Sequence, residues 1–171
     1  YEPSRIVIGS SSDRATRIVI RLFASLKCPK VVMDPKSAEL TKYAANAFLA
    51  TKIGFINEIA HLCEELGADV DHVARGIGLD PRIGLDFLRA GLGWGGSCFP
   101  KDVRALHLLG ISLNSTMPIV SASLEMNLRA RSRIIDRLTR ELGVLQGKRI
   151  GVLGIAFKAH TDDTRDSAAI E

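Results

Sequence analysis

A cysteine stands in a run of small residues, Gly95-Gly96-Ser97-Cys98, followed by Phe99-Pro100-Lys101-Asp102. Glycines let a backbone approach a ligand closely and adopt positive φ angles. The nucleophilic form of cysteine is the thiolate, and the nearby Lys101 would favour it electrostatically. The pattern therefore indicates a nucleophile on an exposed loop. The residues alone equally allow a surface turn with an incidental thiol.

Lys42 and Asn46 are spaced four residues apart, so on a helix both project from one face. The run from Tyr43 to Ile59 is mostly apolar, which predicts a largely buried helix in which a lysine needs a partner. Asp102 is a candidate partner. The alternative is a solvated helix face with no chemical role.

Composition excludes several classes of protein. The net charge is +4, but the basic residues form no block, and 5% aromatic residues supply no base-stacking platform for nucleic acid. A mild positive charge suits small anionic molecules. No apolar run is long enough to span a membrane, and the N-terminus does not resemble a signal peptide. The spacing of the three cysteines does not predict a disulfide framework, so a cytoplasmic location is expected. His61 and Cys63 form one pair without a second pair at metal-ligand spacing, so no metal site is predicted.

The elements needed to position these residues are mainly helical. We expect a strand at 5–8, a helix over about 14–25 capped by Asp13, and a strand at 31–33. A helix of nearly thirty residues should run from Ser37 to a capping Gly67, with Gly54 at a close crossing or bend. Next come a short helix capped by Asp69 or Asp71 and the glycine-rich loop 91–97. A long helix should then run from Pro118 to about Leu142, followed by a buried strand at 148–154. The predicted fold is a mainly α centre flanked by α/β stubs, hence a fragment of a larger protein.

Five separated segments together resemble the UDP-glucose/GDP-mannose dehydrogenase family. They are AELTKYAANAFLA (38–50), DPRIG (80–84), FLRAG (87–91), GGSCFPKD (95–102) and GIAFK with TDDTR (154–158, 161–165). The resemblance implies the tail of an NAD-binding Rossmann domain at 1–36, a central helical dimerisation domain at 37–145 and the start of a nucleotide-sugar-binding Rossmann-like domain at 146–171. Trp94, where Phe or Tyr is usual, and Ala168, where Pro is usual, depart from the family pattern.

The resemblance also implies an activity: oxidation of the C6 alcohol of a nucleotide sugar to a carboxylate, in two hydride transfers to NAD. Cys98 matches the nucleophile that forms a thiohemiacetal and then a thioester, and Lys42, Asn46 and Asp102 match its catalytic polar cluster. Substrate-contacting positions are matched by Lys42, Arg82, Phe87, Leu88, Arg89, Ala90, Gly91, Gly95 and Lys158. Lys101 and Arg165 match positions near NAD, and no metal is implied.

Phe99 favours the UDP-glucose branch of the family over the GDP-mannose branch, which remains the alternative substrate. A further alternative, of another class, is a non-catalytic helical dimerisation module. The implied partners are a UDP-sugar and a second copy of the chain bound through the central helices, with neither nucleic acid nor membrane. Because the glycine fingerprint of an NAD site is absent, the isolated chain is expected to be inactive.

Overall fold

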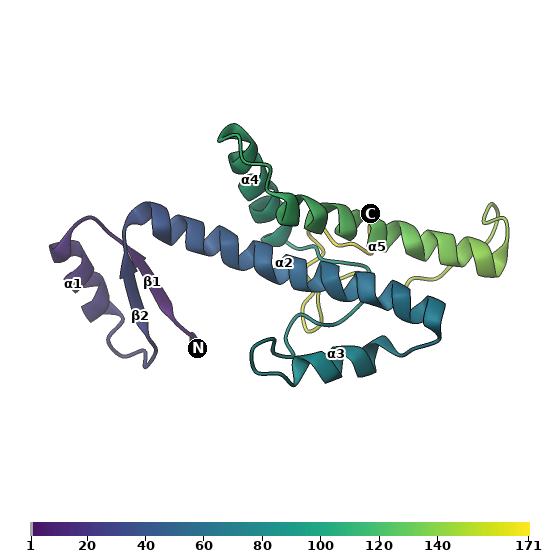
Figure 1. Cartoon of the computed structure of the whole chain (residues 1–171), viewed down its shortest axis with the longest axis horizontal. Helices are drawn as coiled ribbons and strands as arrows, with labels where there is room; N and C mark the ends of the chain where they lie inside the picture. The colour runs from purple at the N-terminus through teal and green to yellow at the C-terminus, as the bar shows by residue number, and fades with distance from the viewer. Residues whose placement is uncertain (1) are drawn as a thin grey trace. The chain divides into compact units, whose positions relative to one another are not determined.

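The computed structural model describes residues 2–171 and divides into two compact units (Figure 1). The N-terminal unit ends at Ala45, and the C-terminal unit comprises Asn46–Glu171. The boundary falls inside one long helix. The predicted fold class, mainly helical with a small α/β portion, is confirmed.

The N-terminal unit contains a β-α-β segment made of strand β1 (Ile6–Gly9), helix α1 (Asp13–Leu22) and strand β2 (Lys30–Met33). The strands pair in parallel, with Ile6 opposite Lys30 and Gly9 opposite Met33. The predicted cap and extent of α1 are wrong. Ser12 is the N-cap, because its side chain accepts a hydrogen bond from the Ala15 N–H at 3.3 Å, and the helix ends at Leu22 rather than near residue 25.

Helix α2 (Pro35–Leu66) is 32 residues long, close to the predicted extent. The Asp34 carboxylate caps it by accepting a hydrogen bond from the Ser37 N–H at 3.0 Å. Gly67 follows with a φ of +67°, the left-handed conformation that glycine adopts after helices. The prediction that α2 is largely buried is wrong: Phe48 is 67% and Phe55 48% exposed. The buried residues of the helix lie in the part that belongs to the C-terminal unit: Asn46, Ala47, Ala50, Gly54, Ile56, Asn57 and Cys63.

Helix α3 (Val70–Gly78) begins at Asp69, whose carboxylate accepts hydrogen bonds from the backbone N–H groups of Asp71 and His72. It packs on α2 through a small core of Ile56, Ala74 and Leu88, surrounded by Ile59, Val70, Ile77 and Ala90. The chain between α3 and the glycine-rich loop is thereby attached to the middle of α2.

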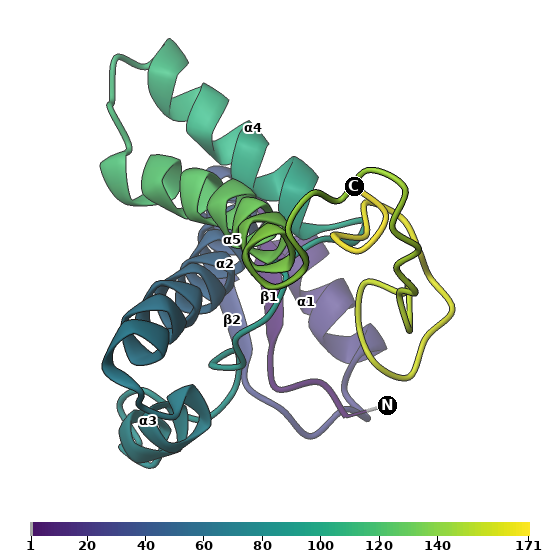
Figure 2. The same ribbon diagram turned by 90° about the vertical axis from the view of Figure 1, so that its right-hand side faces the viewer.

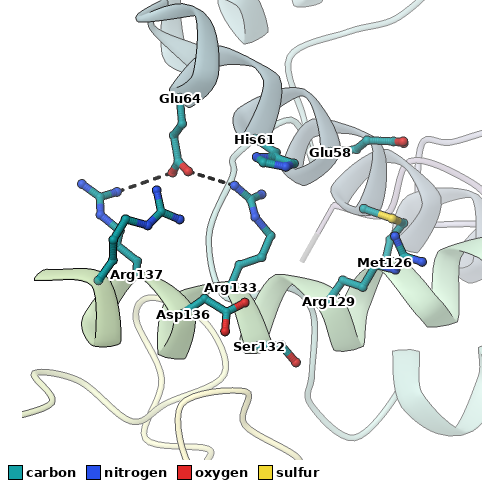
Figure 3. Close-up of a pocket in the computed structure, with 10 residues that line it drawn as sticks. Glu58, His61, Glu64, Met126, Arg129, Ser132, Arg133, Asp136 and Arg137 are labelled. Carbon is teal, nitrogen blue, oxygen red and sulfur yellow. Dashed lines mark hydrogen bonds and ion pairs between the residues drawn. The ribbon is translucent and has the colours of Figure 1, made fainter. Parts of the chain in front are cut away.

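Helix α5 (Pro118–Leu142) has the predicted bounds and is capped by Gly143. It lies alongside α2 in both views (Figures 1 and 2). A Cβ atom placed on Gly54 would lie 3.6 Å from the Met126 Cβ, which confirms the predicted close crossing. Towards the C-terminal ends of the helices, Glu64 of α2 pairs with Arg133 at 2.9 Å and Arg137 at 3.4 Å (Figure 3).

Two parts of the C-terminal unit differ from the sequence-based expectation. Helix α4 (Phe99–Ser112) begins directly at the cysteine motif, where no helix was predicted. The predicted buried strand at 148–154 is wrong: these residues form no strand, and Leu153 is fully exposed. A strand needs a neighbour to satisfy its backbone hydrogen bonds, and no other strand of residues 2–171 lies beside this segment.

Candidate active site

Cys98 occupies the N-cap position of α4 and its side chain is exposed, as predicted. The glycines before it are required by what packs on them. Gly96 has a φ of +83°, and a Cβ placed there would lie 2.6 Å from the Phe157 ring. The Gly96 N–H donates to the Asp166 carbonyl oxygen at 3.2 Å, and a side chain on Gly95 would collide with that same carbonyl. Segment 157–167 therefore packs directly on the glycine-rich loop.

That segment brings two predicted binding residues to the cysteine loop. The Arg165 guanidinium donates to both oxygens of Asp163, at 2.9 and 2.6 Å. Hydrogen bonds from the Arg165 side chain and backbone, with smaller contributions from the charges of Arg165 and Lys158, lower the pKa of Asp163 to about 2. The pKa of Arg165 is raised, first by its hydrogen bond to Asp163 and by the charge of Asp163, with a smaller contribution from the charge of Cys98. A fixed cation thus lies within electrostatic reach of the sulfur.

A buried polar pair lies one turn along α4. Asp102 is 3% exposed and its carboxylate accepts hydrogen bonds from Asn46 Nδ2 and Lys101 Nζ, both at 2.6 Å. Burying a carboxylate is costly unless it is paired, so these donors hold it in place. The predicted grouping of Asn46 with Asp102 is present. Lys42 lies one turn before Asn46 on α2 and is exposed, which corrects the expectation that it is buried.

Aromatic side chains border the cysteine on the side of the predicted substrate segment 87–91. The Phe99 ring lies 6.1 Å from the Phe87 ring and 6.4 Å from the Trp94 ring. Phe87 has a φ of +65°, an unfavourable conformation for a side chain of this size, and such strain concentrates at functional loops. Leu88 is buried in the core with Ile56, so its side chain packs inside the protein.

Two further polar residues hold the loop, and neither was predicted from the sequence. Asn57 of α2 and Asn127 of α5 are each 5% exposed. The Asn57 side chain bonds to the backbone of Gly91, and that of Asn127 to the backbone of Trp94. The available signal was an asparagine inside an amphipathic helix. Asparagine has a low helix propensity, so its presence there indicates that the side chain has a specific partner.

Other predicted residues are placed away from this cluster or remain solvent-facing. Arg82 is exposed and donates to both carboxylate oxygens of Asp80, which raises the pKa of the guanidinium. Arg89 is also exposed, whereas Ala90 is partly buried against the core. A cavity of about 450 Å³ between α2 and α5 is lined by Glu58, His61, Arg129 and Arg133 among others, none of them a predicted site residue (Figure 3).

Two other kinds of feature are absent from residues 2–171. No three His, Cys, Asp or Glu side chains come together where they could hold a metal ion. No helix in this range combines the length and the apolar character needed to cross a membrane. The three cysteines at 28, 63 and 98 are free thiols.

Comparison with known proteins assigns the chain. Residues 36–129 match the sequence model of the UDP-glucose/GDP-mannose dehydrogenase family, central domain. The chain is 48% identical to UDP-glucose 6-dehydrogenase TuaD of Bacillus subtilis, over 98% of this chain and 36% of the relative. Against UDP-glucose 6-dehydrogenase of Rickettsia felis it is 46% identical, over 99% of this chain and 39% of the relative. A UDP-glucose dehydrogenase structure from Pyrobaculum islandicum superposes with a TM-score of 0.97 at 45% identity, over 99% of this chain and 39% of that one.

The structure is that of a helical domain. It presents a candidate nucleophilic cysteine on a glycine-rich loop, beside a buried Asn–Asp pair. Its match to the family's central domain covers more than half of the chain. The chain belongs to the UDP-glucose/GDP-mannose dehydrogenase family. It spans between a third and two fifths of the length of the relatives it matches.

Proposed function

We propose that the full-length protein carrying this chain is an NAD-dependent UDP-glucose 6-dehydrogenase of the cytoplasm. The observation that carries the proposal is the exposed Cys98 at the start of α4, one helical turn from the buried Asn46–Asp102 pair. The relatives named UDP-glucose 6-dehydrogenase support UDP-glucose as the substrate. The reaction converts one UDP-glucose, two NAD and one water into UDP-glucuronate, two NADH and three protons.

Cys98 is the nucleophile in this proposal. Its sulfur adds to the C6 aldehyde left by the first hydride transfer and forms a thiohemiacetal, which becomes a thioester when the second hydride leaves. Hydrolysis of the thioester releases the carboxylate and returns the thiol. Lys42 and Asn46 supply an ammonium and an amide donor for the developing oxyanion, and Asp102 takes part in proton transfer and water activation.

Substrate and cofactor are assigned to the segments around the cysteine. The UDP-sugar is contacted by Lys42, Phe87–Gly91, Gly95 and Lys158. Arg82 reaches the sugar site of a second subunit. NAD, when bound, accepts both hydrides. Lys101 and the exposed Arg165 suit its anionic diphosphate, since Arg165 is held rigidly by Asp163 beside Cys98.

A homodimer is part of the proposal. Phe48, Phe55 and Leu62 recur every seven residues on α2 and are 67%, 48% and 55% exposed. Side chains at this spacing share one face of a helix, and this apolar stripe is unfavourable in water unless another surface covers it. A second copy of α2 supplies a complementary apolar surface. This stripe is also what the alternative of a non-catalytic dimerisation module would use, but that module has no use for the cysteine loop.

NADH formation by the purified full-length protein tests the proposal. UDP-glucose should support turnover with two NADH formed for each UDP-glucose consumed. Turnover with GDP-mannose instead would assign the protein to the other branch of the family. Absence of turnover with both sugars, in a folded dimer that binds neither, would favour the dimerisation module.

A further inference from the structure

The glycine-rich loop is fastened at two points by buried asparagines from different helices. The Gly91 N–H donates to Asn57 Oδ1 at 2.8 Å, while Asn57 Nδ2 donates to the Ile53 carbonyl of its own helix at 3.0 Å. The Trp94 N–H donates to Asn127 Oδ1 at 2.6 Å, and Asn127 Nδ2 donates to the Trp94 carbonyl at 2.9 Å. Both ends of the segment 91–94 are therefore tied to the helical scaffold.

The Asn127 contact determines both the position and the orientation of the backbone at Trp94. A single amide side chain satisfies both the N–H and the carbonyl of that residue, so it resists both displacement and rotation of the backbone. The contact also leaves no space for a side chain on the preceding residue, because a Cβ on Gly93 would overlap Asn127 Oδ1. Water does not compete at this point, since both Asn127 and Trp94 are 5% exposed.

Contacts continue from this anchor to the cysteine. The Trp94 ring packs edge-on against Phe99, the residue that follows Cys98. On the other side, Gly95 and Gly96 lie against the Asp166 carbonyl and the Phe157 ring. A shift of the Trp94 backbone would therefore be passed to Cys98 from both directions. The Asn57 anchor lies instead at Gly91, the end of the segment assigned to the sugar substrate.

We propose that Asn127 and Asn57 are positioning residues with separate tasks, an inference that rests on the proposed function. Asn127 holds the nucleophile end of the loop, so that the Cys98 sulfur meets the aldehyde carbon in line. Asn57 holds the end that contacts substrate. Neither side chain touches reacting atoms; each acts through the backbone to which it bonds.

The test compares Asn127→Ala and Asn57→Ala in the full-length protein. Misplacing a nucleophile by about an ångström costs roughly 100-fold in rate. We expect Asn127→Ala to lower kcat roughly 10- to 100-fold with KM for UDP-glucose within about threefold of wild type. Asn57→Ala should chiefly raise KM. Ser123→Ala is the matched control, because Ser123 is 3% exposed on α5 and its hydroxyl makes no hydrogen bond within residues 2–171.

Hydrogen–deuterium exchange of the peptide containing residues 91–97 provides a readout independent of catalysis. Each alanine variant should speed exchange of this peptide at least about tenfold while leaving α5 protected. Unchanged exchange in both variants, or the same change of kcat and of KM in Asn127→Ala and Asn57→Ala, would overturn the proposal. Inactive wild-type protein with the expected exchange pattern would instead contradict the proposed function and leave the loop anchors in place.

Discussion

Two cations bear on the surroundings of Cys98. Lys101 is the one that the sequence motif predicts, and its ammonium also bonds to the Asp102 carboxylate at 2.6 Å. Arg165 comes from a segment more than sixty residues further on, and its pKa is raised first by Asp163, with a smaller contribution from the charge of Cys98. The approach of Arg165 to the cysteine loop depends on the fold, which the motif around Cys98 does not reveal.

The titration of Asp163 gives a test at the scale of the residue. Its pKa is held at about 2 by hydrogen bonds from Arg165. A carboxyl whose folded pKa is depressed contributes stability above its ordinary pKa and loses it as pH falls toward the folded value, so this contact is complete above about pH 5 and lost toward pH 2. Carboxyl NMR should show the low pKa, and Arg165→Ala should raise it toward the ordinary range, because the guanidinium hydrogen bonds are lost while the backbone N–H of residue 165 still donates to Asp163. An unchanged pKa in the variant would show that Arg165 does not hold Asp163.

Part of the candidate site could be predicted from residue types alone. The exposed thiol was predicted from the glycines around Cys98. Asp102 was predicted as a partner for Lys42, and the family resemblance grouped it with Asn46, which donates a hydrogen bond to it. Asn57 and Asn127 could not be predicted in the same way. Their partners are backbone atoms 34 and 33 residues distant, and backbone groups leave no pattern in the sequence. Contacts between a side chain and a distant backbone become visible only with the fold.

Two glycines of the C-terminal unit give opposite predictions for the effect of an alanine substitution on stability. Gly54→Ala should stabilise the protein by about 0.5–1 kcal/mol, because a helical glycine is entropically unfavourable and the added Cβ meets Met126 and Ser123 at ordinary contact distances of 3.6 and 3.9 Å. Gly96→Ala should destabilise by about 1–3 kcal/mol, since its φ is +83° and the Cβ meets the Phe157 ring. Chemical denaturation of both variants would check the difference. Equal effects of the same sign would contradict the described packing.

Helices with local signals at their ends were predicted best. Asp34, Gly67, Pro118 and Gly143 give α2 and α5 their bounds through hydrogen bonds and φ preferences that act within a few residues. Helix α4 was not predicted because the glycines before Cys98 favour a loop; Pro100 lies in its first turn, where proline is compatible with the start of a helix. The strand expected at 148–154 failed because strand formation depends on a neighbouring strand, which local sequence does not supply.

At the scale of the whole molecule, the apolar stripe predicts self-association. Phe55→Glu places a charge in the middle of the stripe, so the full-length protein should shift from dimer to monomer at micromolar concentration in equilibrium sedimentation. Leu108→Glu is the matched control, because Leu108 is 63% exposed on α4 and does not belong to the stripe. A dimer that tolerates Phe55→Glu as well as Leu108→Glu would place the interface elsewhere.

The proposed catalytic cycle needs parts beyond this chain, which spans 36–39% of its named relatives. Hydride transfer requires a cofactor site, whereas this chain carries the proposed nucleophile Cys98 and the Asn46–Asp102 pair. The isolated chain should therefore form no NADH from UDP-glucose. Mutations in the full-length protein can separate the task of Cys98 from those of the flanking parts.

Overall turnover of Cys98→Ser in the full-length protein tests the central claim most directly. The thiol is needed only after the first hydride transfer, so the variant should bind UDP-glucose about as well as wild type but lose formation of UDP-glucuronate. Product can be followed by chromatography, with sugar-nucleotide binding measured by calorimetry on the same preparation. Near-normal formation of UDP-glucuronate by Cys98→Ser would show that Cys98 is an ordinary loop residue, and the mechanism proposed here would be wrong.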